Sequence, residues 1–225
     1  MNKTEIGKHP LLTESVLNLP SRDKAEALLD EAGVLNPGPW TAHSRYVAQA
    51  AETIAGRCTR LDPHKAYVLG CLHDIGRRGG VTGMRHVIDG YRYLAALDFE
   101  EAARISLTHS YPIKVAASGF GGWDGSEAEL QFVQDYLDRI EYTPYDRLIQ
   151  LCDSLALPNG FCLIEKRLID VVMRYGFNEY AIPKWEAIFD IKHEFDRATG
   201  GSIYNLLPGV IENTFGISQL PVNRS

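Results

Sequence analysis

The chain has 225 residues, of which 45% are hydrophobic, and a formal net charge of −6. This composition is typical of a globular protein with one substantial core. No apolar run approaches the roughly 20 residues that span a bilayer, and the N-terminus lacks the apolar segment of a secretory signal. The acidic balance, without a basic run, argues against binding to long nucleic acid. We therefore expect a single-domain cytoplasmic protein without a membrane partner.

Four cysteines are scattered along the chain without a CxxC pair: Cys58, Cys71, Cys152 and Cys162. Three of them lie in apolar stretches that favour a helix. This distribution indicates small core residues in a reducing compartment, and not a disulfide framework or a zinc site.

The spacing of apolar residues predicts helices nearly throughout the chain. Predicted helices cover residues 23–32, 41–60, 62–76, 84–97, 100–109, 126–140, 145–157, 163–175 and 183–198. Thr41 and Ser126 are candidate caps, and Asp62 followed by Pro63 is a strong helix start signal. No strand pattern competes with these helices, so the sequence predicts an all-α helical bundle with mostly short connections.

Two loops interrupt this pattern. The first, Arg77-Arg78-Gly79-Gly80, is basic and follows directly on the helix that is expected to end near Gly76. The second, at residues 118–125, is rich in glycine and carries Phe120 and Trp123. It is either a cover for a bound base or an ordinary surface loop.

His73 and Asp74 are the most informative residues of the chain. They are neighbours in the apolar stretch Tyr67-Val68-Leu69-Gly70-Cys71-Leu72-His73-Asp74-Ile75-Gly76. A carboxylate buried there costs free energy unless it is paired or bound to a metal. The alternative for Asp74 alone is a cap on the following helix. Imidazole nitrogen and carboxylate oxygen suit Fe, Mn, Zn, Ni or Cu better than Ca or Mg.

Further residues of the same chemistry lie on either side of this pair: His43 upstream, and His86, His109 and Asp153 downstream. Asp153 shares an apolar helix face with Ile149 and Ala156, without an obvious lysine partner nearby. The alternative for Asp153 is an ion pair with an arginine of another helix. His86 and His109 lie near predicted helix ends, where each could also be merely exposed.

The ordered set His43, His73-Asp74 and Asp153 resembles the signature of the HD superfamily of metal-dependent phosphohydrolases, H…HD…D. The resemblance spans roughly residues 40–155. It implies an all-α, HD-type fold in which these four residues bind a metal ion. It also implies three stretches: an N-terminal helical extension at 1–39, an HD domain core at 40–157, and C-terminal helices at 158–225 packed on that core.

The additional His86 and His109 resemble the subset of this superfamily that binds two metals, which includes diadenosine tetraphosphate hydrolases. For this chain the resemblance implies one or two divalent transition metals (Fe, Mn, Ni, Co or Zn), with Asp74 as a bridge to a second ion held by His86 and His109. Several two-metal members have a further histidine directly after the residue that matches His109. This chain has Ser110 there, as the diadenosine tetraphosphate hydrolase branch also has a hydroxyl residue.

The implied activity is hydrolysis of a nucleotide or another small phosphate ester through attack of metal-bound hydroxide, with Asp74 and Arg77 as catalytic residues. Arg77 follows Asp74 by three residues, so it points to the same side of a helix, and its planar guanidinium suits phosphate. The alternative for Arg77 is an ion pair at the helix end. Arg78, Arg85 and Lys114 are further candidates for contact with the anionic substrate.

Two other functions use the same residues. One is an oxygenase with a di-iron centre, as in some members of the two-metal subset. The other is a metal-stabilised regulatory module, which a complete set of ligands makes less favoured. The expected partners are a small phosphorylated substrate and, as an open possibility, a second copy of the chain in a homodimer.

Overall fold

The computed structural model describes residues 18–217, and the part of the predicted N-terminal extension before residue 18 lies outside this range. The described residues are mostly helical, with only one two-stranded hairpin among them, so the predicted all-α, single-domain fold is confirmed. The α-helices are α1 (Arg22–Leu35), α2 (Trp40–Ala55), α3 (Pro63–Leu72), α4 (His86–Ala95), α5 (Glu100–Thr108), α6 (Glu127–Arg139), α7 (Pro144–Asp153), α8 (Ile164–Tyr175), α9 (Ala181–Thr199) and α10 (Val210–Phe215). Three short 3-10 helices accompany them: η1 (Ile75–Gly79), η2 (Ala116–Ser118) and η3 (Ile203–Leu206).

Two of the three predicted helix caps are confirmed. The side chain of Asp62 accepts hydrogen bonds from the backbone N–H groups of His64 and Lys65 at the start of α3, and Ser126 begins α6 with a capping box. The prediction for Thr41 is wrong. Helix α2 begins one residue earlier, after Pro39, and the Thr41 hydroxyl donates to the carbonyl of Gly38 instead.

The predicted helix at 62–76 is interrupted just where its polar residues begin. Helix α3 ends at Leu72, His73 follows as its C-cap, and Asp74 has left the helical region with φ −102° and ψ 14°. The chain then continues as the 3-10 helix η1. His73 and Asp74 therefore lie at the junction between α3 and η1 and not within a continuous helix.

The predicted helix at 145–157 is also too long. Helix α7 ends at Asp153, and the next residues form a small antiparallel hairpin between β1 (Ala156–Leu157) and β2 (Gly160–Phe161). Ala156 pairs with Phe161, and Leu157 pairs with Gly160. Pro158-Asn159 supplies the turn, and turn residues of this kind end a helix readily.

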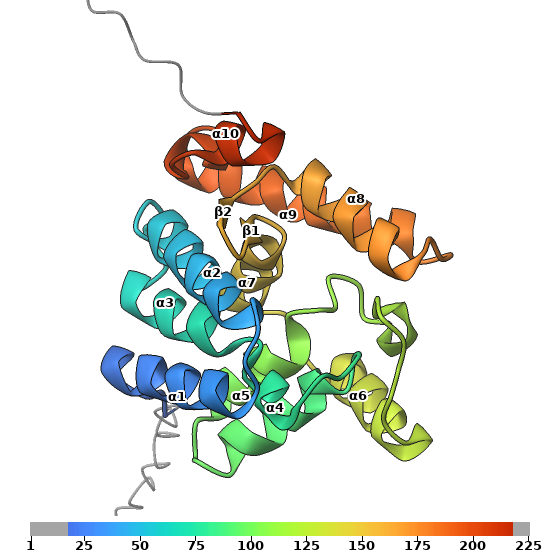
Figure 1. Cartoon of the computed structure of the whole chain (residues 1–225). Coiled ribbons are helices and arrows are strands. Elements are labelled where there is room, and N and C mark those ends of the chain that lie inside the picture. Colours follow the sequence, from blue (N-terminus) through green and yellow to red (C-terminus); the bar gives the residue numbers. More distant parts are fainter. Residues whose placement is uncertain (1–17, 218–225) are drawn as a thin grey trace, which may run out of the picture.

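Among the described residues, the core consists of two clusters of buried apolar side chains. The larger cluster draws mainly on α1, α2, α3, α7 and α9 and includes Leu29, Ile54, Leu72 and Ile149. The smaller one joins α4, α5 and α6 through residues such as Ile88 and Leu137. Figure 1 shows α8, α9 and α10 gathered at one end of the molecule, beyond α7 and the β-hairpin.

Two glycines allow neighbouring elements to approach unusually closely. A Cβ atom on Gly70 of α3 would lie 2.7 Å from the Cα of Ala48 on α2. A Cβ atom on Gly76 of η1 would lie 1.9 Å from the carbonyl oxygen of His86 at the start of α4. Both distances are far below ordinary van der Waals contact, so only glycine fits at these positions.

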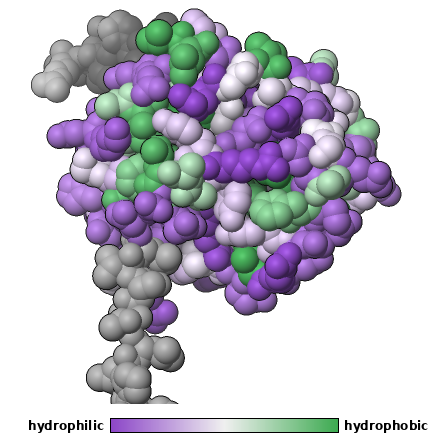
Figure 2. All heavy atoms as spheres, turned by 90° about the horizontal axis from the view of Figure 1, so that it is seen from below, coloured by the Kyte–Doolittle hydropathy of each residue, from purple (hydrophilic) through white to green (hydrophobic). Residues whose placement is uncertain are grey.

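Among the described residues, no helix is long and apolar enough to cross a membrane. The face of the molecule seen in Figure 2 is mostly hydrophilic, with separate, smaller hydrophobic patches.

The contact at Gly76 predicts a specific loss of stability. Gly76→Ala should lower the free energy of unfolding by at least roughly 1–3 kcal/mol, because the added methyl group collides with the backbone of α4. Gly79→Ala is a matched control in the same 3-10 helix, because no atom of residues 18–217 lies within 4 Å of its Cβ position. It should change the free energy of unfolding by less than about 1 kcal/mol. Urea denaturation measures both, and equal values would contradict this account of the packing.

Candidate metal centre

The six residues that the sequence singles out as metal ligands come together from five places in the fold. His43 lies in the first turn of α2, His73 and Asp74 follow α3, His86 begins α4, His109 follows α5, and Asp153 ends α7. Five of the six are buried, with at most 6% of the residue exposed, and only Asp153 is partly exposed. The breaks and ends of helices therefore place these polar groups at the junction of the elements.

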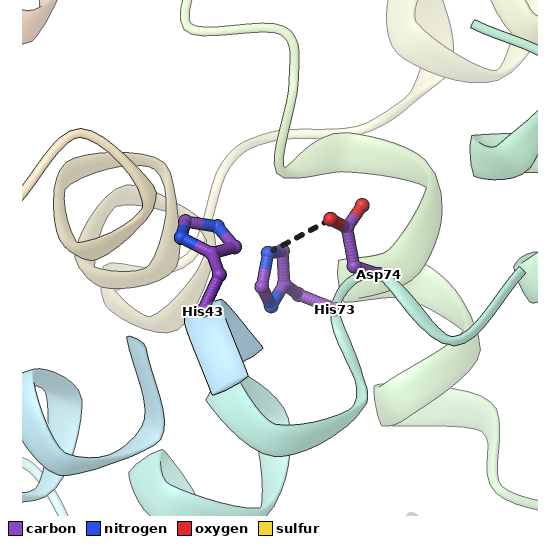
Figure 3. A group of neighbouring side chains, drawn as sticks. All are labelled: His43, His73 and Asp74. Carbon is purple, nitrogen blue, oxygen red and sulfur yellow. Dashed lines mark ion pairs between the residues drawn. The ribbon is translucent and has the colours of Figure 1, made fainter. Parts of the chain in front are cut away.

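The first group of potential ligands consists of His43, His73 and Asp74, whose ligand atoms all lie within 4.8 Å of one another. Figure 3 shows the three side chains side by side, with the ring of His73 between His43 and Asp74. The Nε2 atom of His73 is 3.8 Å from Asp74 Oδ2. Asp153 completes the group, since its Oδ1 lies 2.9 Å from His43 Nε2 and 4.0 Å from His73 Nε2.

The second group consists of Asp74, His86 and His109. Here the other carboxylate oxygen of Asp74, Oδ1, is 3.2 Å from His86 Nε2 and 3.5 Å from His109 Nε2. Asp74 thus presents one oxygen to each group. This is the arrangement required of a carboxylate that bridges two ions.

Three of the histidines are held in one tautomer by the backbone. The Nδ1 atoms of His73, His86 and His109 lie 2.7, 2.6 and 2.9 Å from the carbonyl oxygens of Gly70, Gly83 and Ser106. A carbonyl only accepts, so Nδ1 donates its proton and Nε2 keeps a lone pair. In all three residues this lone pair is on the ring nitrogen nearest Asp74. Histidine ligands of metals are commonly oriented by such a bond from the other ring nitrogen.

The protonation states agree with this geometry. Burial lowers the pKa of His73 to about 3, against the opposing effect of the Asp74 charge, and burial also lowers the pKa of His86. Burial alone would raise the pKa of Asp74, but the charge of Arg77 and the neighbouring imidazoles hold it well below its usual range. Neutral imidazoles and an ionised carboxylate are the forms that bind metal ions.

The site fits a metal ion because it leaves buried polar atoms unsatisfied. His73 Nε2 and Asp74 Oδ1 are buried and have no hydrogen-bond partner in the part of the chain that the structure describes. Lone pairs on His86 and His109 also face the same Asp74 oxygen, which is unfavourable unless a cation lies between them. One ion would be held by His43, His73, Asp74 and Asp153, and another by Asp74, His86 and His109. Nitrogen and oxygen donors together favour a divalent transition metal.

Arg77 lies against the two groups of potential metal ligands (the metal groups), as its spacing from Asp74 suggests. Its Nε donates to Asp74 Oδ2 at 2.7 Å, and one terminal nitrogen is 3.4 Å from His86 Nε2. The carbonyl of Arg77 accepts a bond from the side chain of Asn36 at 2.6 Å. The guanidinium therefore stands at the edge of the metal groups, where it is 29% exposed.

Arg78 and Lys114 are placed elsewhere. Arg78 forms an ion pair with Glu31 and stacks on the ring of Tyr93. Lys114 donates to the carbonyl of Ile140 and pairs with Glu141. Neither lines the cavity beside the metal groups, because partners in other elements hold each one away from it. This placement does not support the role in substrate binding that the sequence suggested for them.

A cavity of about 680 Å³ opens beside the metal groups, large enough for a nucleotide-sized molecule. Its walls include His43, Asp74, His86, His109 and Asp153, together with Arg77. The sequence interpretation missed three cations that also line it: Arg167 and Arg174 of α8, and Lys184 of α9. The only signal for the arginines was their spacing of seven residues, which places both on one face of a helix.

Lys184 is nearly fully buried, with 7% exposed. Its Nζ donates to the carbonyls of Ser118 and Ser110 at 2.9 and 3.2 Å and lies 4.6 Å from the ring of Phe120. Burial lowers the pKa of this amine to about 8. Lys184 thus holds together the two ends of the segment that leads from His109 to the glycine-rich loop.

Comparison with known proteins agrees with this geometry. Residues 40–157, more than half of the chain, match the model of the HD domain. The chain therefore belongs to the HD domain family, whose members are typically metal-dependent phosphohydrolases. All six potential ligands lie within the matched residues. No curated protein and no solved structure matches the chain.

Removing a ligand of the second group alone should reduce the number of bound ions. We expect calorimetric titration of the metal-free protein with Mn²⁺ to show two sites, and one site in His86→Ala, because Asp74 and His109 alone provide too few ligands. His64→Ala is the control, since His64 is exposed on α3, and it should retain two sites. A single site in the unaltered protein would contradict the two-metal assignment.

Asp124 should affect metal binding by the second group, although Asp124 is not itself one of the potential ligands. Its carboxylate accepts hydrogen bonds from the backbone N–H groups of Gly83 and Arg85 at 2.7 and 2.8 Å, and the Gly83 carbonyl in turn orients His86. Asp124→Ala should weaken the second site by about tenfold or more and leave the first unchanged. Asp135→Ala, on the outer side of α6, is the control. Equal titration curves for both variants would show that Asp124 does not position His86.

Proposed function

We propose that the protein is a metal-dependent phosphohydrolase that acts on a small phosphate ester, with a nucleotide as the preferred class. One observation carries the proposal. Two buried groups of metal ligands share Asp74 and open into a cavity whose other charged groups, within residues 18–217, are all cations: Arg77, Arg167, Arg174 and Lys184. The chain as a whole is acidic, so this local positive charge favours an anionic substrate.

When bound, divalent transition metal ions lower the pKa of water to about 7 and so supply a hydroxide nucleophile near neutral pH. The role of the chain is then to position the reactants and to neutralise charge, which are the main requirements of phosphoryl transfer. Arg77 is placed to donate to phosphoryl oxygens while its Nε stays on Asp74.

A nucleotide is preferred to other phosphate esters because aromatic side chains line the same cavity. Trp40, Phe120, Tyr175 and Trp185 are among its walls. Phe120 belongs to the glycine-rich loop, and the centre of its ring lies 4.6 Å from Lys184 Nζ. Aromatic rings stack on any nucleotide base, because every base has a π-face. Trp123 of the same loop does not line the cavity, because its indole N–H donates to the carbonyl of Ser126.

The same ligands suit a di-iron centre, so an oxygenase is the second candidate. The cationic walls of the cavity favour a phosphate ester but do not distinguish it from a phosphonate. A purely regulatory module is disfavoured because all six ligands are present and meet in two groups. The metal content and the products therefore decide between hydrolysis and oxidation.

Phosphate release from a panel of mononucleotides, dinucleotides and sugar phosphates, with Mn, Fe, Co or Ni supplied, tests the proposal. We expect hydrolysis of nucleotides and its loss in Asp74→Asn, because the amide removes the charge shared by both metal groups. His193→Ala, an exposed residue on the outer side of α9, should keep full activity. Hydrolysis of sugar phosphates alone would reject the nucleotide preference. No hydrolysis, with oxygen consumption by the iron-loaded protein, would establish the oxygenase.

A further inference from the structure

One wall of the cavity comes from α8, which lies beyond the residues that match the HD domain. The residues of α8 that line the cavity recur at helical spacing: Arg167, Leu168, Val171, Arg174 and Tyr175. This spacing puts all of them on one face of the helix. The opposite side carries the exposed Ile169 and Met173. Helix α8 therefore presents a defined face, with a cation near each end, to the interior of the site.

The two arginines of this face stand in different surroundings. Arg167 reaches the metal groups, since its terminal nitrogen is 3.6 Å from Asp153 Oδ1. Arg174 lies seven residues further along, a rise of about 10 Å. Within residues 18–217, Arg174 has no ion-pair partner, and only its Nε is engaged, by the carbonyl of Asp170 at 3.2 Å. Arg174 is exposed and lines the cavity. Within the described residues, the carboxylates that line this cavity, Asp74 and Asp153, both belong to the metal groups.

Tyr175 and the glycine-rich loop complete the surroundings of Arg174. The Arg174 guanidinium lies 5.8 Å from the centre of the Tyr175 ring. A Cβ atom on Gly121 would lie 3.3 Å from the same ring, so the loop and the end of α8 meet at this side of the cavity. A group bound by Arg174 would thus lie at the end of the cavity away from Asp153.

We propose that Arg174 forms a second anion-binding subsite, two helical turns along α8 from Arg167, which binds a second phosphate of the substrate. This inference rests on the proposed function, because the first phosphate is the one hydrolysed at the metal groups. A single phosphoryl group is too small to contact both the metal groups and Arg174 at the far end of α8. The favoured substrate is therefore a nucleotide with a second phosphate apart from the reacting one.

The test compares adenosine 3′,5′-bisphosphate with adenosine 5′-monophosphate as substrates of the Mn-loaded full chain. Arg174→Ala should raise KM for the bisphosphate by about tenfold or more, as expected for the loss of a hydrogen bond to a charged group. Its kcat, and both constants for the monophosphate, should stay within about twofold, because the variant leaves the metal groups intact. Lys166→Ala is the matched control, since Lys166 lies on the same helix, is paired with Asp170 and does not line the cavity.

Two results would overturn the proposal. In one, Arg174→Ala raises KM equally for both substrates, which would place Arg174 at the reacting phosphate. In the other, Arg174→Ala behaves as Lys166→Ala does, which would show that Arg174 does not contact the substrate.

If the unaltered protein hydrolyses neither nucleotide, the proposed function fails for them and the subsite is tested by binding alone. Calorimetric titration of the Mn-loaded protein with inorganic tripolyphosphate and with inorganic phosphate should show tighter binding of tripolyphosphate. Arg174→Ala should weaken that binding by about tenfold and leave phosphate binding unchanged, with the Mn content of the recovered protein as a control. No binding of tripolyphosphate, or equal affinity in the variant, would overturn the subsite.

Discussion

The site depends on one buried carboxylate that faces imidazole lone pairs from both sides. Asp74 is 4% exposed, and each of its oxygens is directed at a different group of histidines. Without cations between them, these atoms would repel one another in a region of low dielectric constant. The close approaches at Gly70 and Gly76 bring α3 and η1 against α2 and α4 and so place the histidines around Asp74. The close packing of these elements therefore brings the carboxylate and imidazole lone pairs of the site together.

The sequence was sufficient to predict the helical fold and the residues that meet at the site, because metal ligands come from few residue types. It could not predict where the helices break. The apolar pattern continues from Leu72 to Ile75, and both residues are fully buried, so hydrophobic spacing alone indicates an unbroken helix. The break at His73 comes just before the close approach of Gly76 to α4, a tertiary contact that no local pattern reveals.

The cations of the cavity were harder to predict than the ligands. The sequence suggests Arg78 as a residue that binds the substrate, yet Glu31 of α1 and Tyr93 of α4 hold it elsewhere. Arg174 and Lys184 are more than twenty residues beyond Asp153 in the chain, in helices with an ordinary mixture of charges. Only the folding of α8 and α9 over the end of the bundle (Figure 1) brings them to the cavity. Arginine and lysine are common on surfaces, so their residue type gives no comparable signal.

The division of the cavity between two parts of the chain has an evolutionary consequence. All six potential ligands precede residue 158, whereas the face of α8 that lines the cavity follows it. Substitutions on that face change the size and charge of the far wall and leave Asp74 and the four histidines in place. Selection can thus alter which molecules are accepted while the reactive centre is inherited intact. Chains that share the ligand pattern but differ along this one helix are expected to diverge in substrate before they diverge in chemistry.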